Sequence, residues 1–317
     1  MPNLADDVLA GYRALRESVG RVDIDDVRFF ALVGADRIGW LQGQVTQDLS
    51  GREVGSFCDA CLCSPTGQLL ADLRVWFAED RVLIAVPGSQ AEALQRRVAT
   101  AVVLEVVELE ELGLPRYSVQ GPMADSWASS RFGVVADGGS AGVLRVGEIW
   151  LLRSDRVGHP GWDVLGDAEP TPEIPNVGAE ATCVASLEAG RPLPGADTHS
   201  RTLPPELGPA FESSHVSYQK GCYTGQEVLM RIHSRGHTNK TWCGLLCDGP
   251  VSAGDSVSHP ARDDAGTVTR SAWSPALGWI AGATLRNEAA NDGDVVAVKT
   301  GAGVVRAVVR SMPLWPR

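Results

Sequence analysis

The spacing of apolar residues predicts a helix at the start of the chain. Between residues 5 and 19 an apolar stripe recurs at helical intervals, which is typical of a helix that packs one face on a protein core. The members of this stripe are Val8, Leu9, Tyr12, Leu15 and Val19.

Strands and further helices are predicted to follow in a mixed order. Runs rich in β-branched and aromatic residues predict strands at 27–33, 69–77, 81–86 and 117–120, and 101–109 is also rich in strand-forming residues. Helices are predicted at 35–49, after Ser89, where Glu92 would complete a capping box, and from Gly121 through Trp127. This β-α-β-β order favours an α+β sandwich over a doubly wound sheet.

The character of the chain changes beyond Lys240. Short strands recur there at regular spacing between Gly, Asp and Pro turns, which is typical of a small β-barrel. The predicted strands are 241–247, 266–272, 278–285, 294–299 and 304–309. Upstream, the proline-containing and acidic stretch 167–178 is expected to be a surface connection.

Composition narrows the functional classes. The chain has 317 residues, of which 44% are hydrophobic, enough for two or more packed units, and its net charge is −11. An acidic chain is a poor match for the phosphate backbone, so direct binding of nucleic acid is not expected. The apolar runs are too short to span a bilayer and the first residues do not form an export signal, so we expect a cytoplasmic protein without membrane contact whose seven cysteines are reduced.

The segment 220–227, Lys-Gly-Cys-Tyr-Thr-Gly-Gln-Glu, concentrates the candidate chemistry. Cysteine reacts as the thiolate, and a neighbouring cation such as Lys220 would favour the thiolate of Cys222. Only three of the 28 basic residues are lysines, which suggests that a point charge is wanted at this position. The alternative is a small buried cysteine in a glycine-flanked turn.

This segment, with Arg231 and the pair Arg235-Gly236, resembles the signature of the YgfZ family, the folate-binding relatives of the glycine cleavage T-protein (GcvT). A second block agrees: Leu187-Glu188-Ala189-Gly190-Arg191-Pro192, then Gly195, Asp197 and 203–208. Weaker similarity covers 29–34, 40–49 and 64–68. The resemblance implies a GcvT-like α+β fold, a two-lobed α/β sandwich over residues 1–240 followed by a small C-terminal β-barrel over 241–317. The expected lobes are 1–50 with 115–240, and 51–114.

The resemblance also implies a function. It predicts a tetrahydrofolate-binding protein that supports assembly or repair of iron-sulfur clusters in other enzymes, with folate, in the form of tetrahydrofolate or a one-carbon derivative, as its cofactor. Iron-sulfur assembly proteins or client enzymes would be its partners. Glu188 matches the glutamate that binds the pterin ring, whose adjacent N–H groups a carboxylate can accept. The predicted catalytic residues are Cys222 and Lys220, and the predicted cofactor-binding residues are Glu188, Tyr223, Gly225, Gln226, Glu227 and Arg231.

Two other functions stay open. The first is a folate-dependent aminomethyltransferase or demethylase acting on a small amine. The segment 86–90 lies where the T-protein is expected to carry its catalytic aspartate, and it contains none, although Asp72 lies on the neighbouring predicted strand. The second is a passive scaffold that binds folate only for stability.

No metal site is expected. Cys58, Cys61 and Cys63 lack a matching second ligand pair, and Cys61 and Cys63 would share one face of a strand. Burial is the favoured interpretation of Cys243 and Cys247. His233 and His237 have helical spacing, but Gly236 between them indicates a loop.

Overall fold

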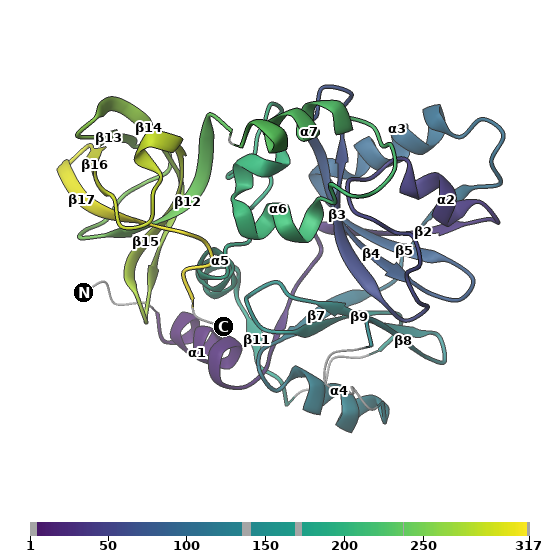
Figure 1. Ribbon diagram of the computed structural model, residues 1–317. Helices are drawn as coiled ribbons and strands as arrows, with labels where there is room; N and C mark the ends of the chain where they lie inside the picture. The colour runs from purple at the N-terminus through teal and green to yellow at the C-terminus, as the bar shows by residue number, and fades with distance from the viewer. Residues whose placement is uncertain (1–4, 135–140, 169–172, 237, 316–317) are drawn as a thin grey trace.

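The computed structural model describes residues 5–134, 141–168, 173–236 and 238–315, and these form two sheets and a closed barrel (Figure 1). The six-stranded sheet has the order β11-β1-β7-β10-β9-β8, and the five-stranded sheet has the order β3-β4-β5-β2-β6. Six further strands close the barrel at the other end of the molecule. This α+β architecture with a C-terminal barrel is the fold expected from the sequence.

The six-stranded sheet is built mainly from the middle of the chain. Its strands pair antiparallel except for β1 with β11, which are parallel. They are β1 (Gly20–Val22), β7 (Arg116–Gln120), β8 (Val143–Val146), β9 (Ile149–Ser154), β10 (Gly161–Leu165) and β11 (Asn176–Val177). The strand predicted at 117–120 is therefore confirmed.

The five-stranded sheet is antiparallel throughout. Its strands are β2 (Val27–Val33), β3 (Phe57–Cys63), β4 (Leu69–Phe77), β5 (Val82–Pro87) and β6 (Glu108–Glu111). The strands predicted at 27–33 and 69–77 are confirmed. Strand β2 belongs to this sheet, together with strands from the expected lobe 51–114.

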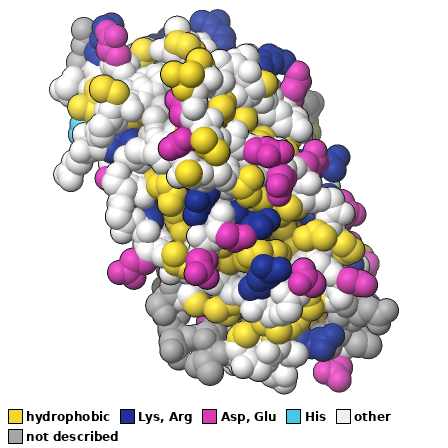
Figure 2. All heavy atoms as spheres, turned by 90° about the vertical axis from the view of Figure 1, so that its right-hand side faces the viewer, with side chains coloured by type: hydrophobic (Ala, Val, Ile, Leu, Met, Phe, Trp, Pro, Cys, Tyr) yellow, Lys and Arg dark blue, Asp and Glu magenta, His cyan; other side chains and the backbone are white. Residues whose placement is uncertain are grey.

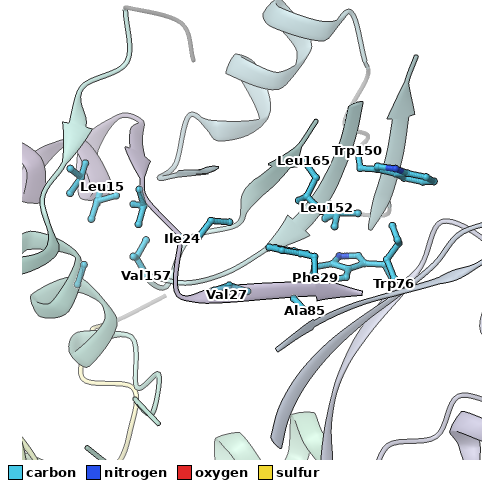
Figure 3. Packing of buried hydrophobic residues seen from close by; sticks show 14 of the residues in the cluster. Leu15, Ile24, Val27, Phe29, Trp76, Ala85, Trp150, Leu152, Val157 and Leu165 are labelled. Carbon is cyan, nitrogen blue, oxygen red and sulfur yellow. The ribbon is translucent and has the colours of Figure 1, made fainter. Parts of the chain in front are cut away.

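The two sheets face each other across a shared apolar core (Figure 3). Trp76 of β4 belongs to this core, and the centre of its ring lies 6.4 Å from that of Phe29 on β2. Leu152 and Trp150 approach from β9. The Trp76 indole N–H donates to the carbonyl of Arg153 at 3.0 Å, so this buried aromatic also satisfies its polar atom.

The helices pack at the edges of the two sheets and between the sheets and the barrel. They are α1 (Asp6–Glu17), α2 (Arg37–Gln42), α3 (Ala91–Ala101), α4 (Ala124–Phe132), α5 (Ala179–Glu188), α6 (Pro209–His215) and α7 (Gln226–Arg235). The predicted N-terminal helix is confirmed as α1, which packs against α5. Helix α5 lies between the barrel and the sheets (Figure 1).

The barrel has the strand order β12-β15-β14-β13-β16-β17. Its strands are β12 (Lys240–Cys247), β13 (Ser256–His259), β14 (Arg262–Ser274), β15 (Gly278–Arg286), β16 (Val295–Thr300) and β17 (Gly303–Arg310). The five predicted strands are confirmed, and β14 is longer than predicted. The pattern missed β13, a four-residue strand with one fully buried apolar residue, Val257.

Three local predictions were wrong. The helix predicted at 35–49 ends at Gln42, because Val45 forms a bridge with Leu62 of β3 and the chain continues as a loop. Ser89 does not cap a helix: it lies in a short 3-10 turn, and α3 starts at Ala91 without a side-chain cap. Within 101–109 only β6 begins, and Leu104 is 93% exposed, so the apolar character there reflects no buried strand.

Candidate functional site

A cavity lies where α5 and α6 meet the two sheets, and we call it the central cavity. It consists of two adjoining hollows of about 590 and 270 Å³, a size typical of small-molecule sites. Strands β3 and β4, the loops after β9 and α5, and helix α6 all contribute to its wall. The residues that line both hollows are Asp59, Arg74, Asp155, Arg191, Phe211 and His215.

Two ion pairs form part of this wall. Asp59 and Arg74 are directly opposite each other on β3 and β4, and their side chains approach to 2.6 Å. Arg191 reaches Asp155 at 2.6 Å. Burial would raise the pKa of Asp59, but the Arg74 guanidinium outweighs it and lowers that pKa to about 2. The cavity therefore presents fixed charges of both signs.

A third pair joins α6 to β4. His215 Nε2 lies 3.1 Å from Asp72 Oδ1, and the His215 ring stacks on Phe211 at 3.7 Å between centroids. Burial disfavours the charged imidazole, but the carboxylates of Asp72 and Asp59 outweigh it and raise the pKa of His215. The His215 side chain is buried, whereas the Asp72 side chain is 31% exposed toward the smaller hollow.

Asp72 also lies beside the segment that lacks an aspartate. Its backbone N–H donates to the side-chain oxygen of Gln90 at 2.9 Å, and Val86 and Pro87 line the same hollow. The absence of aspartate from 86–90 therefore does not leave this wall of the cavity without a carboxylate.

Glu188 ends α5 and is fully buried. Its carboxylate accepts hydrogen bonds from the Tyr12 hydroxyl at 3.0 Å, from the Arg16 guanidinium at 2.5 Å and from the Ser274 hydroxyl at 2.5 Å. The next three residues, 189–191, line the larger hollow, but Glu188 itself does not. In this arrangement Glu188 joins α1, α5 and the barrel behind the cavity wall.

The Lys220 side chain is also hydrogen-bonded within the protein. Its ammonium group donates to the backbone carbonyls of Gln42 at 2.6 Å, Val45 at 2.7 Å and Gln47 at 2.9 Å. Burial lowers the pKa of Lys220 to about 8, and Asp48 opposes the shift. All three ammonium protons have backbone acceptors, so Lys220 clamps the loop after α2 and does not bond to the Cys222 thiol.

The neighbouring residues of segment 220–227 lie around the Lys220 side chain. Cys222 is exposed, whereas the Tyr223 ring is buried beneath the Lys220 ammonium at 5.1 Å. Gly225 has φ +90°, and a Cβ there would lie 2.6 Å from the Ser64 carbonyl oxygen, so only glycine fits against the β3–β4 turn.

Helix α7 presents the last three predicted residues. The Gln226 side chain donates to the Lys220 carbonyl at 3.4 Å, and exposed Glu227 pairs with exposed Arg231 at 3.0 Å. None of the motif residues lines the central cavity. The structure thus separates the central cavity from the exposed part of segment 220–227 that carries Cys222, which we call the cysteine loop. The sequence analysis had joined the two in one site.

The described residues offer no group of three or more His, Cys, Asp or Glu side chains arranged to hold a metal. Cys58, Cys61 and Cys63 are buried on β3, and burial raises the pKa of Cys58 and Cys63 to about 12. Cys243 is buried on β12, and Cys247 is partly buried. His233 stacks on Tyr218, and His237 lies outside the described residues.

Sequence reasoning did not nominate Asp59, Arg74, Asp155, Arg191 or His215 as site residues, although Arg191 lies in the block 187–192. A signal existed for one wall: Asp72 and Arg74 alternate with buried Ala71, Leu73 and Val75 along β4. Charged residues on the second face of such a strand indicate a polar cavity or solvent. No comparable signal links His215 to Asp72.

The face shown in Figure 2 carries acidic and basic side chains intermixed, without a continuous basic area. Within the described part of the chain, no helix has both the length and the apolar composition needed to cross a bilayer.

Comparisons with known proteins agree with this architecture. Residues 240–315 match the family model of the glycine cleavage T-protein C-terminal barrel domain. The structure is similar to the crystal structure of the glycine cleavage system aminomethyltransferase T from Bartonella henselae, with a TM-score of 0.84 over 97% of this chain and 89% of that one, at 18% identity.

Two curated relatives illustrate the range of names. An aminomethyltransferase of Thermosynechococcus vestitus is 25% identical and covers 100% of this chain and 90% of its own length. The tRNA-modifying protein YgfZ of Yersinia enterocolitica is 24% identical over 68% of this chain and 67% of its own length. These similarities indicate the GcvT/aminomethyltransferase superfamily, whose members among these relatives carry both names.

Proposed function

We propose that this chain binds tetrahydrofolate in the central cavity and supports assembly or repair of iron-sulfur clusters in other proteins through Cys222. The observation that carries the proposal is the combination of an internal cavity with charged walls and an exposed cysteine in the segment 220–227. The similarity to a YgfZ protein supports the same interpretation. Client enzymes or assembly factors would approach the cysteine loop from outside.

The cavity suits a folate in size and chemistry. A folate combines a planar ring with N–H donors and carbonyl acceptors and a tail with carboxylates, so it needs acceptors, donors and cations. Asp59, Asp72 and Arg191 supply these groups, and Phe211 adds an aromatic surface. Within this proposal Glu188 shapes the cavity from behind, and it would contact the pterin only after exchanging its present partners.

Calorimetric titration with tetrahydrofolate tests the binding step. We expect a micromolar signal for the wild-type protein and at least tenfold weaker binding for Arg191→Met, which removes a cation from the cavity wall. Arg28→Met is the matched control, because the Arg28–Glu111 pair is exposed and outside the cavity. Absence of wild-type binding would overturn the proposal. Loss of binding in a folded Glu188→Gln variant would show that this carboxylate turns to the ligand.

Cys222→Ser tests the second step. We expect normal folding and folate affinity together with loss of activity of iron-sulfur enzymes in cells that depend on this protein. Cys183→Ser is the control, since Cys183 is partly exposed on α5 and far from the motif in sequence. Normal cluster-enzyme activity with Cys222→Ser would contradict a role for the thiol and favour a passive folate-binding scaffold.

The second candidate is a folate-dependent aminomethyltransferase or demethylase. It is favoured by the Asp72 carboxylate at the cavity and by an aminomethyltransferase relative that spans the whole chain. Formation of methylene-tetrahydrofolate from a small aminomethylated amine with release of the amines, or of methyl-tetrahydrofolate from a methylated amine, by the purified protein would establish this activity. Turnover that persists in Cys222→Ser would separate it from the leading proposal.

A further inference from the structure

The hydrogen-bond partners of His215 suit an imidazolium. Nε2 lies 3.1 Å from the Asp72 carboxylate, and Nδ1 lies 3.0 Å from the carbonyl oxygen of Phe211 and 2.7 Å from the Ser214 hydroxyl. The Ser214 hydroxyl has the carbonyl oxygens of Ala210 and Phe211, at 3.1 and 3.0 Å, as acceptors for its own proton, so both ring nitrogens of an imidazolium can donate. Together with the contact to the Asp72 carboxylate, this arrangement favours the charged ring.

The surroundings keep this cation in place. His215 is 4% exposed, and Phe211 covers one face of its ring. The charged groups that line the cavity with it come from several elements: Asp72 and Arg74 on β4, Asp59 on β3, Asp23 and Asp26 before β2, Arg153 on β9, Asp155 and Arg156 after β9, and Arg191 after α5. Arg74 and Arg191 are already paired with Asp59 and Asp155, which leaves Asp72 as the carboxylate partner of His215.

The Asp72 carboxylate can accept further hydrogen bonds. His215 contacts Oδ1, the carboxylate remains partly exposed, and it borders the smaller hollow. An ionised carboxylate accepts several hydrogen bonds, so it can bind an N–H donor from the cavity without releasing the imidazole.

We propose that His215 is a buried imidazolium that holds Asp72 as an ionised acceptor for an N–H donor or protonated amine of the ligand in the central cavity, so that ligand binding depends on the proton of His215. This inference rests on the proposed function for the identity of the ligand, tetrahydrofolate. His215 acts through Asp72 and is therefore a positioning residue. Loss of its proton would replace a charge-assisted hydrogen bond at Asp72 with a weaker neutral one and so loosen the orientation of the carboxylate. Affinity should therefore fall as pH rises through the His215 titration.

The first measurement needs no ligand. Histidine-ring NMR of the full chain should show one imidazole that titrates above the ordinary value of about 6.5. His215→Gln should remove that signal, and Asp72→Asn should move it toward lower pH. His259→Gln, on the barrel, is the control that should leave it unchanged. A His215 signal that titrates at or below the ordinary value would overturn the inference, whether or not folate binds.

The second measurement is calorimetric titration with tetrahydrofolate from pH 6.5 to 9. We expect wild-type affinity to fall roughly tenfold across the His215 titration, which is the scale of exchanging a charge-assisted hydrogen bond for a neutral one. Folded His215→Gln and Asp72→Asn variants should bind more weakly at pH 6.5 and show a flat profile. Wild-type binding with variant profiles that match it would refute the proton linkage while leaving the proposed function intact. No wild-type binding would refute the proposed function and the ligand part of the inference.

Discussion

Glu188 and Arg16 form an ion pair at 2.5 Å whose two side chains are 0% and 3% exposed. The pair joins α5 to α1, and Ser274 of the barrel donates to the same carboxylate. The backbone carbonyl of Glu188 also accepts from the N–H groups of Leu314 and Trp315 in the C-terminal tail. One residue therefore connects the N-terminal helix, the barrel and the tail.

Breaking this pair should destabilise the protein strongly. Arg16→Met leaves the Glu188 carboxylate buried without its cation, which typically costs roughly 3 to 5 kcal/mol of unfolding free energy. Arg28→Met removes an exposed partner and should cost about 1 kcal/mol or less. Urea denaturation of both variants measures the difference, and equal losses would contradict the structural role of Glu188.

Lys220→Met should loosen the loop after α2. Three backbone carbonyls lose their donor, and we expect a loss of roughly 2 kcal/mol or more. Lys299→Met, at an exposed barrel position, is the matched control and should be nearly neutral. Hydrogen exchange should increase at residues 42–47 in the first variant. Unchanged exchange together with a slower reaction of Cys222 would instead favour direct activation of the thiol by Lys220.

The two glycines that flank Cys222 should differ in their tolerance of alanine. Gly225→Ala places a methyl group 2.6 Å from the Ser64 carbonyl oxygen at φ +90°, which should cost roughly 2 kcal/mol or more. At Gly221 a Cβ would meet nothing within 4 Å, so Gly221→Ala should be close to neutral. Thermal unfolding of the pair tests this contrast, and similar midpoints would contradict the close packing of the motif on the β3–β4 turn.

Cys222 should be the first thiol to be alkylated. It is exposed, whereas four of the other cysteines are buried and two are partly buried. Burial also raises the pKa of Cys243 and Cys247 to about 12, which suppresses their thiolates near neutral pH. Mass spectrometry after brief treatment with iodoacetamide should find the label at Cys222. Preferential labelling of any buried cysteine would show that the barrel or β3 opens more readily than the packing implies.

Acid should remove the contribution of the Asp59 carboxylate to the stability of the folded state. Its folded pKa of about 2 lies below the ordinary value of 3.8, so the carboxylate stabilises the folded state above pH 3.8. This contribution, about 2 kcal/mol, should be lost as pH falls from 3.8 toward 2. Asp59→Asn should lose the stability at neutral pH and flatten this acid limb in denaturation curves. An unchanged acid limb would mean that Arg74 does not hold Asp59 ionised.

The sequence alone determined part of the secondary structure of this protein. Runs rich in β-branched and aromatic residues identified β2 and β4 with their correct ends, and regular turn spacing identified most of the barrel, because these signals depend on residues a few positions apart. The sequence pattern did not reveal the short strand β13 or the end of α2. A single buried valine in β13 and a bridge to β3 after α2 leave little local pattern. Gly225 could also be singled out, because its conformation is a local property of the chain.

Only the tertiary structure decided what the site residues contact. The sequence suggested Lys220 as an activator of Cys222 and Glu188 as a ligand of the pterin, but packing directs the first to three carbonyls and the second to Tyr12, Arg16 and Ser274. His215 and Asp72 are 143 positions apart and meet because α6 packs across the sheet that contains β4. Such contacts depend on the relative placement of whole elements, which is set by the summed burial of many side chains and leaves no trace in the spacing of the residues that meet.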